Sequence, residues 1–414
     1  MRITLKQIRK ATFLLALLLL AGGVGYWFGQ SRQIFQNGDT KIQIIRQTPV
    51  DKPTVKFDLF WNVWDQLGAS FIDKEKVNPV EMVYGAIRGM VASLGDPYTV
   101  FLTPEENLRT QEDLAGSFGG VGIQLGYIDD SLAVIAPLKD SPAEQSGVRA
   151  GDLILEIDGK GTGEMTLPQA VDLIRGPKGS KVVLKLFRSE TSLEVEIVRD
   201  TITVKSVEVE FLDNWCGKAD SCPLVADLQL TRFGDLTNAE WVEAVREIEN
   251  NCLLQQKSCL GVVFDLRNNP GGYLTSSVFI ASEFISSGTV VQQETADGKR
   301  QSYSVDRPGK LLEIPLVVLV NKGSASASEI VAGCLKEYQR AKIIGETTFG
   351  KGTIQEAQDF SGGAGLHITT ARWLLPNGQS IDGKGLVPDV EIAYEPESED
   401  DLQLKKAIEV LSAL

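Results

Sequence analysis

The stretch 321–355 places three serines, Ser324, Ser326 and Ser328, ahead of a lysine, Lys351, that is flanked by glycines. A serine hydroxyl is a weak nucleophile until a neighbouring base removes its proton. A lysine can act as that base when burial keeps its amine neutral, against a reference pKa of about 10.4. These residue types indicate nucleophilic catalysis by a serine and a lysine, and the chemistry alone leaves open which serine takes part.

A lysine base also needs a partner that orients its amine without stabilising the cation. Gln355, four residues after Lys351, offers a neutral amide, whereas a carboxylate at that point would work against the mechanism. Burial beside Phe349 would lower the pKa of Lys351. The alternative interpretation is an ordinary solvated loop lysine.

The chain has one histidine, His367, so a serine–histidine or cysteine–histidine mechanism must use that residue. His367 lies in an alternating run, 365–371, that predicts a strand. We therefore interpret it as a structural strand histidine rather than a catalytic base.

Three apolar runs, each typical of a buried strand, would position the candidate residues. The run 315–320 leads into the serine turn, and a helix pattern follows at once, so a hydroxyl there would lie at a helix N-terminus. The run 341–344 precedes Lys351. The run 260–266 leads to a Gly-Gly turn at 271–272 and then to a helix pattern, without the spacing of a Walker or Rossmann loop. Backbone N–H groups at that turn could form one arm of an oxyanion hole.

Composition limits the classes of function. The chain has 414 residues, enough for two or three domains, with 43% hydrophobic and 23% charged residues, as in globular proteins. Its net charge of −14 argues against nucleic acid as the main partner, because phosphate binding requires a basic surface.

The N-terminus carries a membrane signal. Four basic residues, Arg2, Lys6, Arg9 and Lys10, precede an uncharged apolar run that ends at Gly29. This pattern fits a signal peptide or a marginal transmembrane helix whose N-terminus lies inside. Because no clear cleavage site follows, we favour an uncleaved single-pass anchor in segment 1–29, with a cleaved and secreted form as the alternative. Either way, the bulk of the chain lies outside the cytoplasm.

Four of the five cysteines form two close pairs in polar loops, Cys216 with Cys222 and Cys252 with Cys259. In an oxidising compartment these predict disulfides, either within each pair or across the pairs. A zinc site is the alternative, but the spacing differs from that of zinc knuckles and no histidine is near. Cys334 remains as a core residue.

Segment 113–200 resembles a PDZ domain. A short helix, a Gly-Val-x-x-Gly-Asp turn, a β run and Asp-Gly follow one another over residues 143–159. The preceding loop matches the carboxylate-binding loop of that family, and consecutive N–H groups there could hold a peptide C-terminus. Its residues are Gly119, Gly120, Val121 and Gly122.

The chain as a whole resembles the carboxyl-terminal processing proteases, the tail-specific serine peptidases of family S41. The resemblance covers residues 54–395 and rests on five motifs in order: GDPYTVFLTPEE, DLRNNPGG, NKGSASASEI, GETTFGKGTIQ and PNGQSIDGKGLVPDV. The domains expected beside the anchor and the PDZ domain are a linker (30–52), an N-terminal helical region (53–112), a protease core (201–395) and a C-terminal helical tail (396–414).

The resemblance implies roles for individual residues. By position, Ser326 is the nucleophile, Lys351 the general base and Gln355 the residue that supports the lysine. The oxyanion hole would use the N–H groups of Gly272 and Ala327. A further position, Arg175, matches one thought to couple peptide binding to activity.

The resemblance also implies an α/β multidomain fold: a ββα-superhelix core, related to the crotonase and Clp-protease architectures, with an inserted PDZ domain and a helical cap. The expected protein cleaves substrates near free, apolar C-termini without a metal or other cofactor. It would be a homodimer anchored in a bacterial inner or plasma membrane, with its catalytic part in the periplasm. The rivals are an inactive PDZ scaffold on a protease-like core and a crotonase-like acyl-CoA enzyme, which the export signal disfavours.

Overall fold

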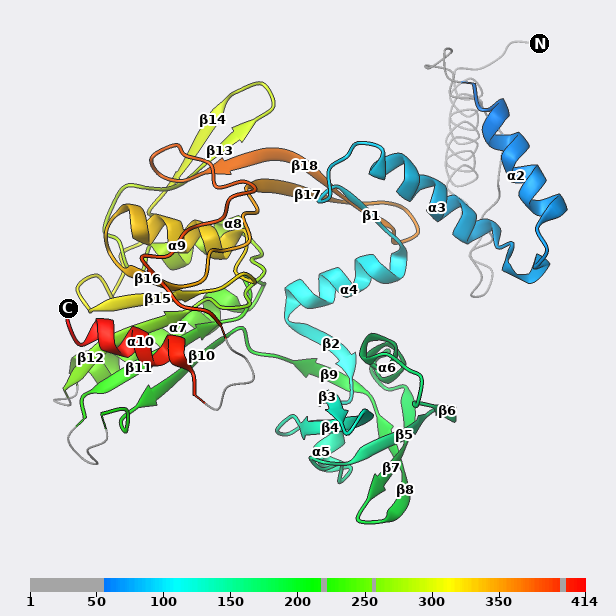
Figure 1. Cartoon of the computed structure of the whole chain (residues 1–414), viewed down its shortest axis with the longest axis horizontal. Helices are drawn as coiled ribbons and strands as arrows, with labels where there is room; N and C mark the ends of the chain where they lie inside the picture. The colour runs from blue at the N-terminus through cyan, green and yellow to red at the C-terminus, as the bar shows by residue number, and fades with distance from the viewer. Residues whose placement is uncertain (1–55, 217–221, 255–257, 395–399) are drawn as a thin grey trace, which may run out of the picture. The chain divides into compact units, whose positions relative to one another are not determined.

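The computed structural model describes residues 56–216, 222–254, 258–394 and 400–414 (Figure 1). The chain divides into two compact units, Met1–Gly85 and Ala86–Leu414. The predicted anchor (1–29) and linker (30–52) lie outside the described residues. Within the described part of the chain, no helix is both long and apolar enough to cross a bilayer.

Two α-helices and a short 3₁₀ turn form the N-terminal helical region. The helices are α2 (Asp58–Ser70) and α3 (Pro79–Ala92), which begins in the first unit and continues into the second. Asn78 caps α3 by accepting the N–H of Val80 at 2.9 Å, and Pro79 occupies the first turn. No residue of α2 is fully buried, and its side chains Leu59, Val63 and Leu67 are exposed.

Helix α4 (Pro104–Ala115) leads into the predicted PDZ region. Thr103 and Glu106 form a capping box at its start. The helix ends at Gly116, which has the left-handed conformation (φ 67°) that glycine adopts readily. The region that follows contains β2 (Ser117–Gly120), β3 (Ile123–Ile128), β4 (Ser131–Pro137), α5 (Pro142–Gln145), β5 (Leu153–Ile157), β6 (Lys160–Gly161), α6 (Leu167–Ile174), β7 (Lys181–Arg188), β8 (Thr191–Val198) and β9 (Asp200–Thr203).

The predicted PDZ region has its own core. Strands β3, β4, β5, β7 and β8 form an antiparallel sheet, to which β6 adds at β5, and β2 pairs separately with β9. Buried apolar side chains from this sheet, from α5 and from α6 make one cluster that includes Val121, Ala143 and Ala170. A separate core is the expected property of a domain.

A six-stranded sheet forms the centre of the larger α/β region. Its strand order is β10-β11-β12-β15-β16-β19, and all neighbours are parallel except the antiparallel pair β10–β11. The apolar runs predicted from sequence are the inner strands, which are buried on both faces. The strands are β10 (Val207–Leu212), β11 (Leu224–Leu230), β12 (Cys259–Asp265), β15 (Leu316–Val320), β16 (Lys342–Gly345) and β19 (Val390–Glu391).

Helices cover both faces of this sheet (Figure 1). Alternate strand residues point to opposite faces, so Val262 packs with helices α7 (Thr237–Ile248), α8 (Leu274–Ala281) and α9 (Ala327–Glu337). Val263 packs instead with the C-terminal helix α10 (Leu402–Leu411).

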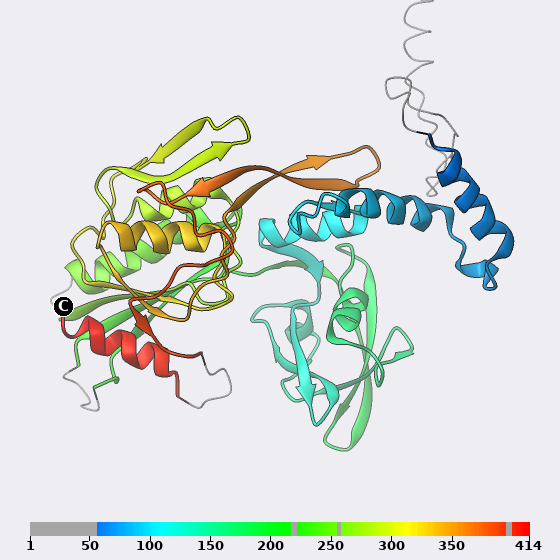
Figure 2. The same cartoon turned by 45° about the horizontal axis from the view of Figure 1, so that its top comes forward.

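A second sheet carries a long hairpin. It contains β1 (Val100–Leu102), β13 (Thr289–Thr295), β14 (Arg300–Ser304), β17 (Thr353–Asp359) and β18 (Gly365–Leu374). Figure 2 shows β17 and β18 extending as a hairpin beyond the six-stranded sheet. His367 lies in β18, as predicted for a strand histidine, and pairs with Val100 and Ala357.

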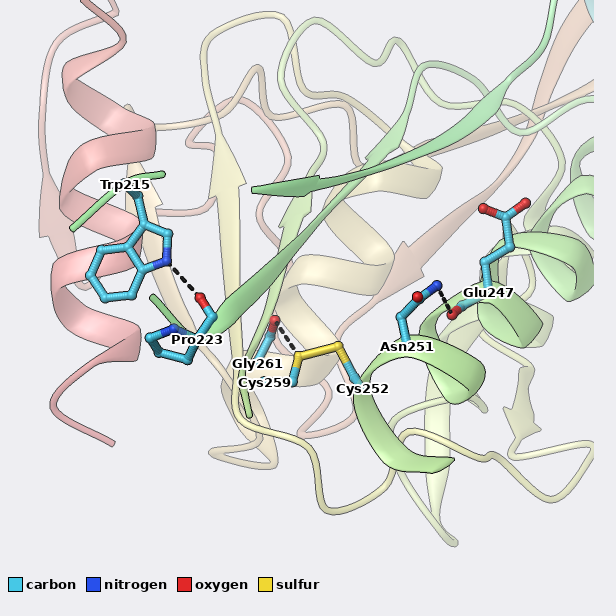
Figure 3. The surroundings of a disulfide bond; sticks show 7 residues. All are labelled: Trp215, Pro223, Glu247, Asn251, Cys252, Cys259 and Gly261. Atoms are coloured by element: carbon cyan, nitrogen blue, oxygen red, sulfur yellow. Dashed lines mark hydrogen bonds between the residues drawn. A yellow bond between two sulfur atoms is a disulfide. The ribbon is translucent and has the colours of Figure 1, made fainter. Parts of the chain in front are cut away.

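The two predicted disulfides are present. Cys216 is bonded to Cys222 between β10 and β11, and Cys252 to Cys259, where a π-helical turn (Glu249–Leu254) leads to β12 (Figure 3). Cys334 is a buried free thiol in α9. Both disulfides therefore lie near the beginnings of parallel strands, whereas the Gly-Gly turn follows the end of β12.

Candidate active site

Two of the three serines in the turn after β15 are structural. Ser324 is fully buried and donates its hydroxyl to the carbonyl of Leu266 at 2.8 Å. Ser328 is equally buried and donates to the carbonyl of Asn269, also at 2.8 Å. Both hydroxyls bind the serine turn to the segment that follows β12, which leaves Ser326 as the candidate nucleophile.

Ser326 occupies the sharp turn between β15 and α9. Its backbone has φ 55° and ψ −115°, a conformation that costs a non-glycine residue about 1–3 kcal/mol and clusters at functional sites. The residue is only partly buried, unlike the fully buried Ser324 and Ser328. Its position at the N-terminus of α9 favours negative charge nearby.

The Glu329 carboxylate joins the serine turn to the lysine loop. It is fully buried, and its Oε2 atom accepts the N–H of Ser326 at 2.8 Å and that of Lys351 at 3.0 Å. Its Oε1 atom accepts the N–H of Gly350 at 2.6 Å and the hydroxyl of Thr348 at 2.5 Å. The backbone nitrogens of Ser326 and Lys351 therefore lie close together, because both donate to the same oxygen atom of Glu329.

Glu329 was not predicted as a site residue from the sequence. The signal for it was available, because a serine followed three residues later by glutamate before an apolar run is the pattern of a capping box. The capping-box pattern does not predict the other contacts of Glu329, which are to Thr348, Gly350 and Lys351.

Lys351 is partly buried and lies beside an aromatic ring. Its Nζ atom is 5.2 Å from the centre of the Tyr98 ring. Burial lowers the pKa of Lys351, while the charges of Asp96 and Glu329 act in the opposite direction. Phe349, the apolar neighbour expected from the sequence, is 56% exposed and does not fill that role. The neighbour is supplied instead by the distant segment before β1.

Gln355 lies on β17, beside a register irregularity in the ladder with β18. Its amide nitrogen donates to the hydroxyls of Thr353 at 2.9 Å and Thr369 at 3.0 Å. Asp96 also bonds to the Thr369 side chain. In the described residues Gln355 thus shares a network with a carboxylate that faces Lys351, rather than bonding to the lysine itself.

The Gly-Gly turn lies against the serine turn. A Cβ atom at Gly271 would be 2.8 Å from Cβ of Ser326 and 2.9 Å from the nitrogen of Ala327, so only glycine fits at this close approach. Within the described chain, the N–H groups of Gly272 and Ala327 donate to no other residue. Two unsatisfied donors beside Ser326 are what an oxyanion hole requires.

Asn269 fixes the shape of the Gly-Gly turn. It is completely buried, and its side chain donates to the carbonyl of Leu230 at 2.7 Å and accepts the N–H of Gly271 at 2.9 Å. Its carbonyl accepts the N–H of Ala325 at 3.0 Å. One asparagine thereby holds the end of β11, the glycine turn and the serine turn together.

The predicted peptide-binding loop forms a second, separate group of residues. Gly119 and Gly120 end β2, and Val121 and Gly122 connect it to β3. The Val121 side chain is buried, and its carbonyl accepts the N–H of Ala143 at 2.9 Å. In the part of the chain described, the N–H groups of Val121 and Gly122 donate to nothing, as a carboxylate-binding loop requires.

Arg175 belongs to this second group rather than to the serine site. Its guanidinium lies 4.0 Å from the centre of the Phe118 ring and 3.7 Å from the carboxylate of Asp113. It lines a cleft of about 450 Å³ that is shared by α4, β2 and the turn after α6. Through Asp113, this arginine contacts α4, the helix that leads into the predicted PDZ region.

The described residues contain no group of three or more histidine, cysteine, aspartate or glutamate side chains arranged to hold a metal ion. The chemistry available at Ser326 is that of a hydroxyl, a partly desolvated amine and two free backbone donors.

Profiles of three domain families match the chain: peptidase family S41 over residues 225–392, a PDZ domain over 134–188, and the activating protease CtpB N-terminal domain over 18–106. The chain is 35% identical over 360 residues to the carboxy-terminal processing protease CtpA of Bacillus subtilis. That alignment spans 86% of this chain and 73% of the relative. A probable CtpA-like serine protease of Staphylococcus epidermidis is also 35% identical, and 64% of its length is spanned.

Solved structures agree with these matches. The photosystem II D1 C-terminal processing protease is 32% identical, with a TM-score of 0.50, over 86% of this chain and 96% of that structure. A putative S41 protease from Bacteroides fragilis, at 15% identity and a TM-score of 0.55 over 90% of this chain and 99% of the other, shows the same fold. The multidomain α/β fold with an inserted PDZ domain, predicted from sequence, is confirmed. The chain belongs to peptidase family S41, the carboxy-terminal processing proteases with a PDZ domain.

Proposed function

We propose that this protein is a serine endopeptidase that cleaves protein substrates near their C-termini, with Ser326 as nucleophile and Lys351 as general base. The observation that carries the proposal is the shared Glu329 carboxylate, which holds the backbone of both residues on one oxygen. The strained backbone of Ser326 and the lowered pKa of Lys351 support the same assignment.

The reaction is acyl transfer. The neutral amine of Lys351 takes the proton of the Ser326 hydroxyl as Oγ attacks the scissile carbonyl carbon. The N–H groups of Gly272 and Ala327 stabilise the oxyanion that forms. The intermediate collapses, the amine product leaves with the proton from Lys351, and an acyl-enzyme remains. Water, deprotonated by Lys351, then attacks the ester and restores the Ser326 hydroxyl.

Gln355 has a supporting role in this scheme. Its neutral amide orients Lys351 without stabilising the charged amine. The Gln355 amide nitrogen is occupied by two threonine hydroxyls, so its carbonyl oxygen is the atom able to accept from the lysine. An uncharged acceptor stabilises the protonated amine less than a carboxylate at the same position would.

The substrate tail binds at the loop formed by Gly119, Gly120, Val121 and Gly122. Its terminal carboxylate accepts from the free N–H groups of that loop, and an apolar side chain next to it enters the PDZ domain. Arg175 couples tail binding to activity in this scheme, and its contact with Phe118 beside the loop supports that role.

The protein acts outside the cytoplasm of a bacterium, held in the inner or plasma membrane by segment 1–29. The two disulfides support an oxidising location.

The exposed apolar side chains of α2, among them Leu59 and Val63, support assembly with a second copy of the chain as a homodimer. Analytical ultracentrifugation of the chain and of a Leu59→Lys/Val63→Lys form tests the dimer: loss of dimer in the variant is expected, and a monomeric wild type contradicts it.

The function is tested with peptides whose apolar C-termini are free or amidated. The wild-type chain is expected to cleave the free form, whereas Ser326→Ala and Lys351→Ala are inactive. Lys322→Ala is the matched control, because this lysine lies in the same serine turn, is 81% exposed and pairs only with Glu346 in the described structure.

Three results would contradict parts of the proposal. Cleavage by Ser326→Ala at the wild-type rate would exclude Ser326 as nucleophile. Equal cleavage of free and amidated peptides would exclude capture of the terminal carboxylate. Tail binding by the wild-type protein without any cleavage would favour the inactive scaffold.

A further inference from the structure

A cluster of charged residues is buried beneath helix α10. Asp227 on β11 and Asp265 on β12 point to the same sheet face as Val225 and Val263, which α10 covers. Asp227 is 5% exposed and Asp265 is 6% exposed. Charged side chains are rarely buried without partners, so the cluster needs an explanation beyond packing.

Arg267 is the cation of this cluster. Its Nε atom donates to both oxygens of Asp265, at 3.0 and 2.9 Å, and a terminal nitrogen donates to Oδ2 at 2.5 Å. The guanidinium side chain is 9% exposed. A bidentate pair at this depth fixes the direction of both side chains.

The same guanidinium is bonded to the beginning of α10. It donates to Asp401 at 3.0 Å and approaches the second oxygen of that carboxylate at 2.8 Å. It also donates to Gln403 at 3.3 Å. Asp401 is at the same time the N-cap of α10, since it accepts the N–H of Leu404 at 2.9 Å.

Arg267 is also the first residue of the segment that ends in the Gly-Gly turn. Its neighbour Asn268 has φ 56° and exchanges two hydrogen bonds, both 2.8 Å long, with Asn321 before the serine turn. Asn269 then sets the conformation of Gly271. A change at Arg267 can therefore reach Gly272 through a short segment in which Asn268, Asn269 and Gly271 are hydrogen-bonded.

We propose that Arg267 is a positioning residue for the oxyanion hole, and that its ion pair with Asp401 makes the C-terminal helix part of the device that holds the Gly272 N–H in place. This rests on the proposed function for the meaning of that N–H. Asp401 and Asp265 hold the guanidinium from two sides, so the geometry of the turn depends on how α10 is seated.

Asp227 gives this arrangement a dependence on pH. Its Oδ1 atom is buried and, among the described residues, has no hydrogen-bond partner. Burial, followed by the charge of Asp265, raises the pKa of Asp227 to about 7, and Asp401 and Glu210 act in the same direction. Arg267 acts in the opposite direction. Above that pH, Asp227 becomes a further anion that competes for Arg267.

The raised pKa of Asp227 also links the stability of the fold to pH. A carboxyl group whose pKa is higher in the folded than in the unfolded chain stabilises the fold most when it is protonated in both, at low pH. Its contribution is lost progressively as the pH rises to the folded value. Above about pH 7, where Asp227 is ionised in the folded chain, its carboxylate competes with Asp265 and Asp401 for Arg267, so the cluster is expected to be looser there than at lower pH.

The test compares the full chain with Asp401→Asn, because asparagine still caps the helix but has no charge for Arg267. The kcat for a free-tailed peptide is expected to fall about ten-fold, the loss of one charge-assisted hydrogen bond, with KM unchanged. Asp400→Asn, one residue earlier and 64% exposed, is the matched control and is expected to match the wild type.

Hydrogen exchange supplies a measurement that does not need peptide cleavage. The hydrogen-bonded backbone amides of Asn268, Asn269 and Gly271 are expected to exchange faster in Asp401→Asn than in the wild type, while those of β15 do not change. A wild type that cleaves nothing would contradict the proposed function, and exchange would still decide this inference.

The pH arm uses Asp227→Asn, which cannot ionise. The ratio of its kcat to that of the wild type is expected to increase from about pH 6 to about pH 8, because only the wild type gains the extra anion. Exchange at the same three amides of the wild type is expected to rise over the same interval. Unchanged exchange and unchanged kcat in Asp401→Asn would overturn the role of Arg267, and a constant ratio would overturn the role of Asp227.

Discussion

The peptide N–H of Ser326 and that of Lys351 donate to one and the same atom, Oε2 of Glu329. Two loops that are separated in sequence by a helix and a strand are thereby held by a single buried carboxylate. Movement of either loop stretches a charge-assisted hydrogen bond in a medium of low polarity, where such bonds are strongest. The alignment of nucleophile and base therefore depends on a residue that takes no part in proton transfer.

Replacing Glu329 with glutamine tests this dependence. The amide retains one acceptor oxygen but turns an NH₂ group toward backbone donors, so at least one pair of donors is left unsatisfied. We expect kcat to fall about 100-fold and the free energy of unfolding to fall by about 3 kcal/mol, the cost of losing one or two charge-assisted bonds. Steady-state kinetics and urea denaturation measure the two effects.

The control for Glu329→Gln is Glu337→Gln, at the exposed end of the same helix. It removes the same charge from α9 without touching either loop and is expected to leave both measurements unchanged. A Glu329→Gln protein with wild-type kcat would show that the shared carboxylate does not align the two residues.

Asp96 should set the pH at which the protein becomes active. Its carboxylate raises the pKa of Lys351, against the lowering caused by burial. Activity rises with pH as Lys351 loses its proton, so removing the Asp96 charge lowers that pKa and moves the rising limb to lower pH. We expect this shift in the kcat/KM profile of Asp96→Asn, with Asp297→Asn as control. An unchanged limb would mean that Asp96 and Lys351 are not coupled.

Gly271 and Gly298 offer a matched pair of glycine substitutions. Both have positive φ, 100° and 77°, so alanine strains either backbone. A Cβ at Gly271 would meet Ser326 and Ala327, whereas at Gly298 it would meet nothing within 4 Å. We expect Gly271→Ala to lose about 100-fold in kcat through the displaced oxyanion donor, and Gly298→Ala to keep its activity. Equal kcat values in the two variants would contradict this account.

The Cys252–Cys259 disulfide should contribute stability rather than activity. It closes a short loop at the beginning of β12 (Figure 3), whereas the Gly-Gly turn follows the other end of that strand. A Cys252→Ser/Cys259→Ser form is expected to lose about 2–3 kcal/mol of unfolding free energy, through the greater freedom of its unfolded chain. Its kcat at 25 °C should match the wild type. A variant as stable as the wild type in urea denaturation would contradict this prediction.

The inner strands, the start of helix α3 and the presence of disulfides were predictable from local sequence, because each depends on a short pattern, whereas the pairing of the four cysteines was left open. Asn78 and Pro79 are typical of a helix start and indicate where α3 begins, and the buried strands are continuous apolar runs. Local chemistry could not choose among Ser324, Ser326 and Ser328. The choice depends on the carbonyls of Leu266 and Asn269, which lie on another strand and turn.

The surroundings of Lys351 were predicted less well, for the same reason. Phe349 was the nearest apolar residue in the sequence, yet the ring beside the amine belongs to Tyr98, from a segment that joins the site by pairing β1 with β18. Contacts between distant segments depend on strand register, which a single sequence does not specify. Glu329 shows both cases, since its bond to Ser326 follows from a local pattern and its bond to Lys351 does not.

The state of the cysteines has a practical consequence for measuring motion in this protein. All five are accounted for in the described structure: four are in disulfides, and the fifth, Cys334, is fully buried, with burial raising the pKa of its thiol to about 12. Thiol reagents act on the exposed thiolate form, so the folded chain offers them no native target. A cysteine introduced at the surface can then be labelled selectively with a fluorophore or spin label, without removing any natural residue first.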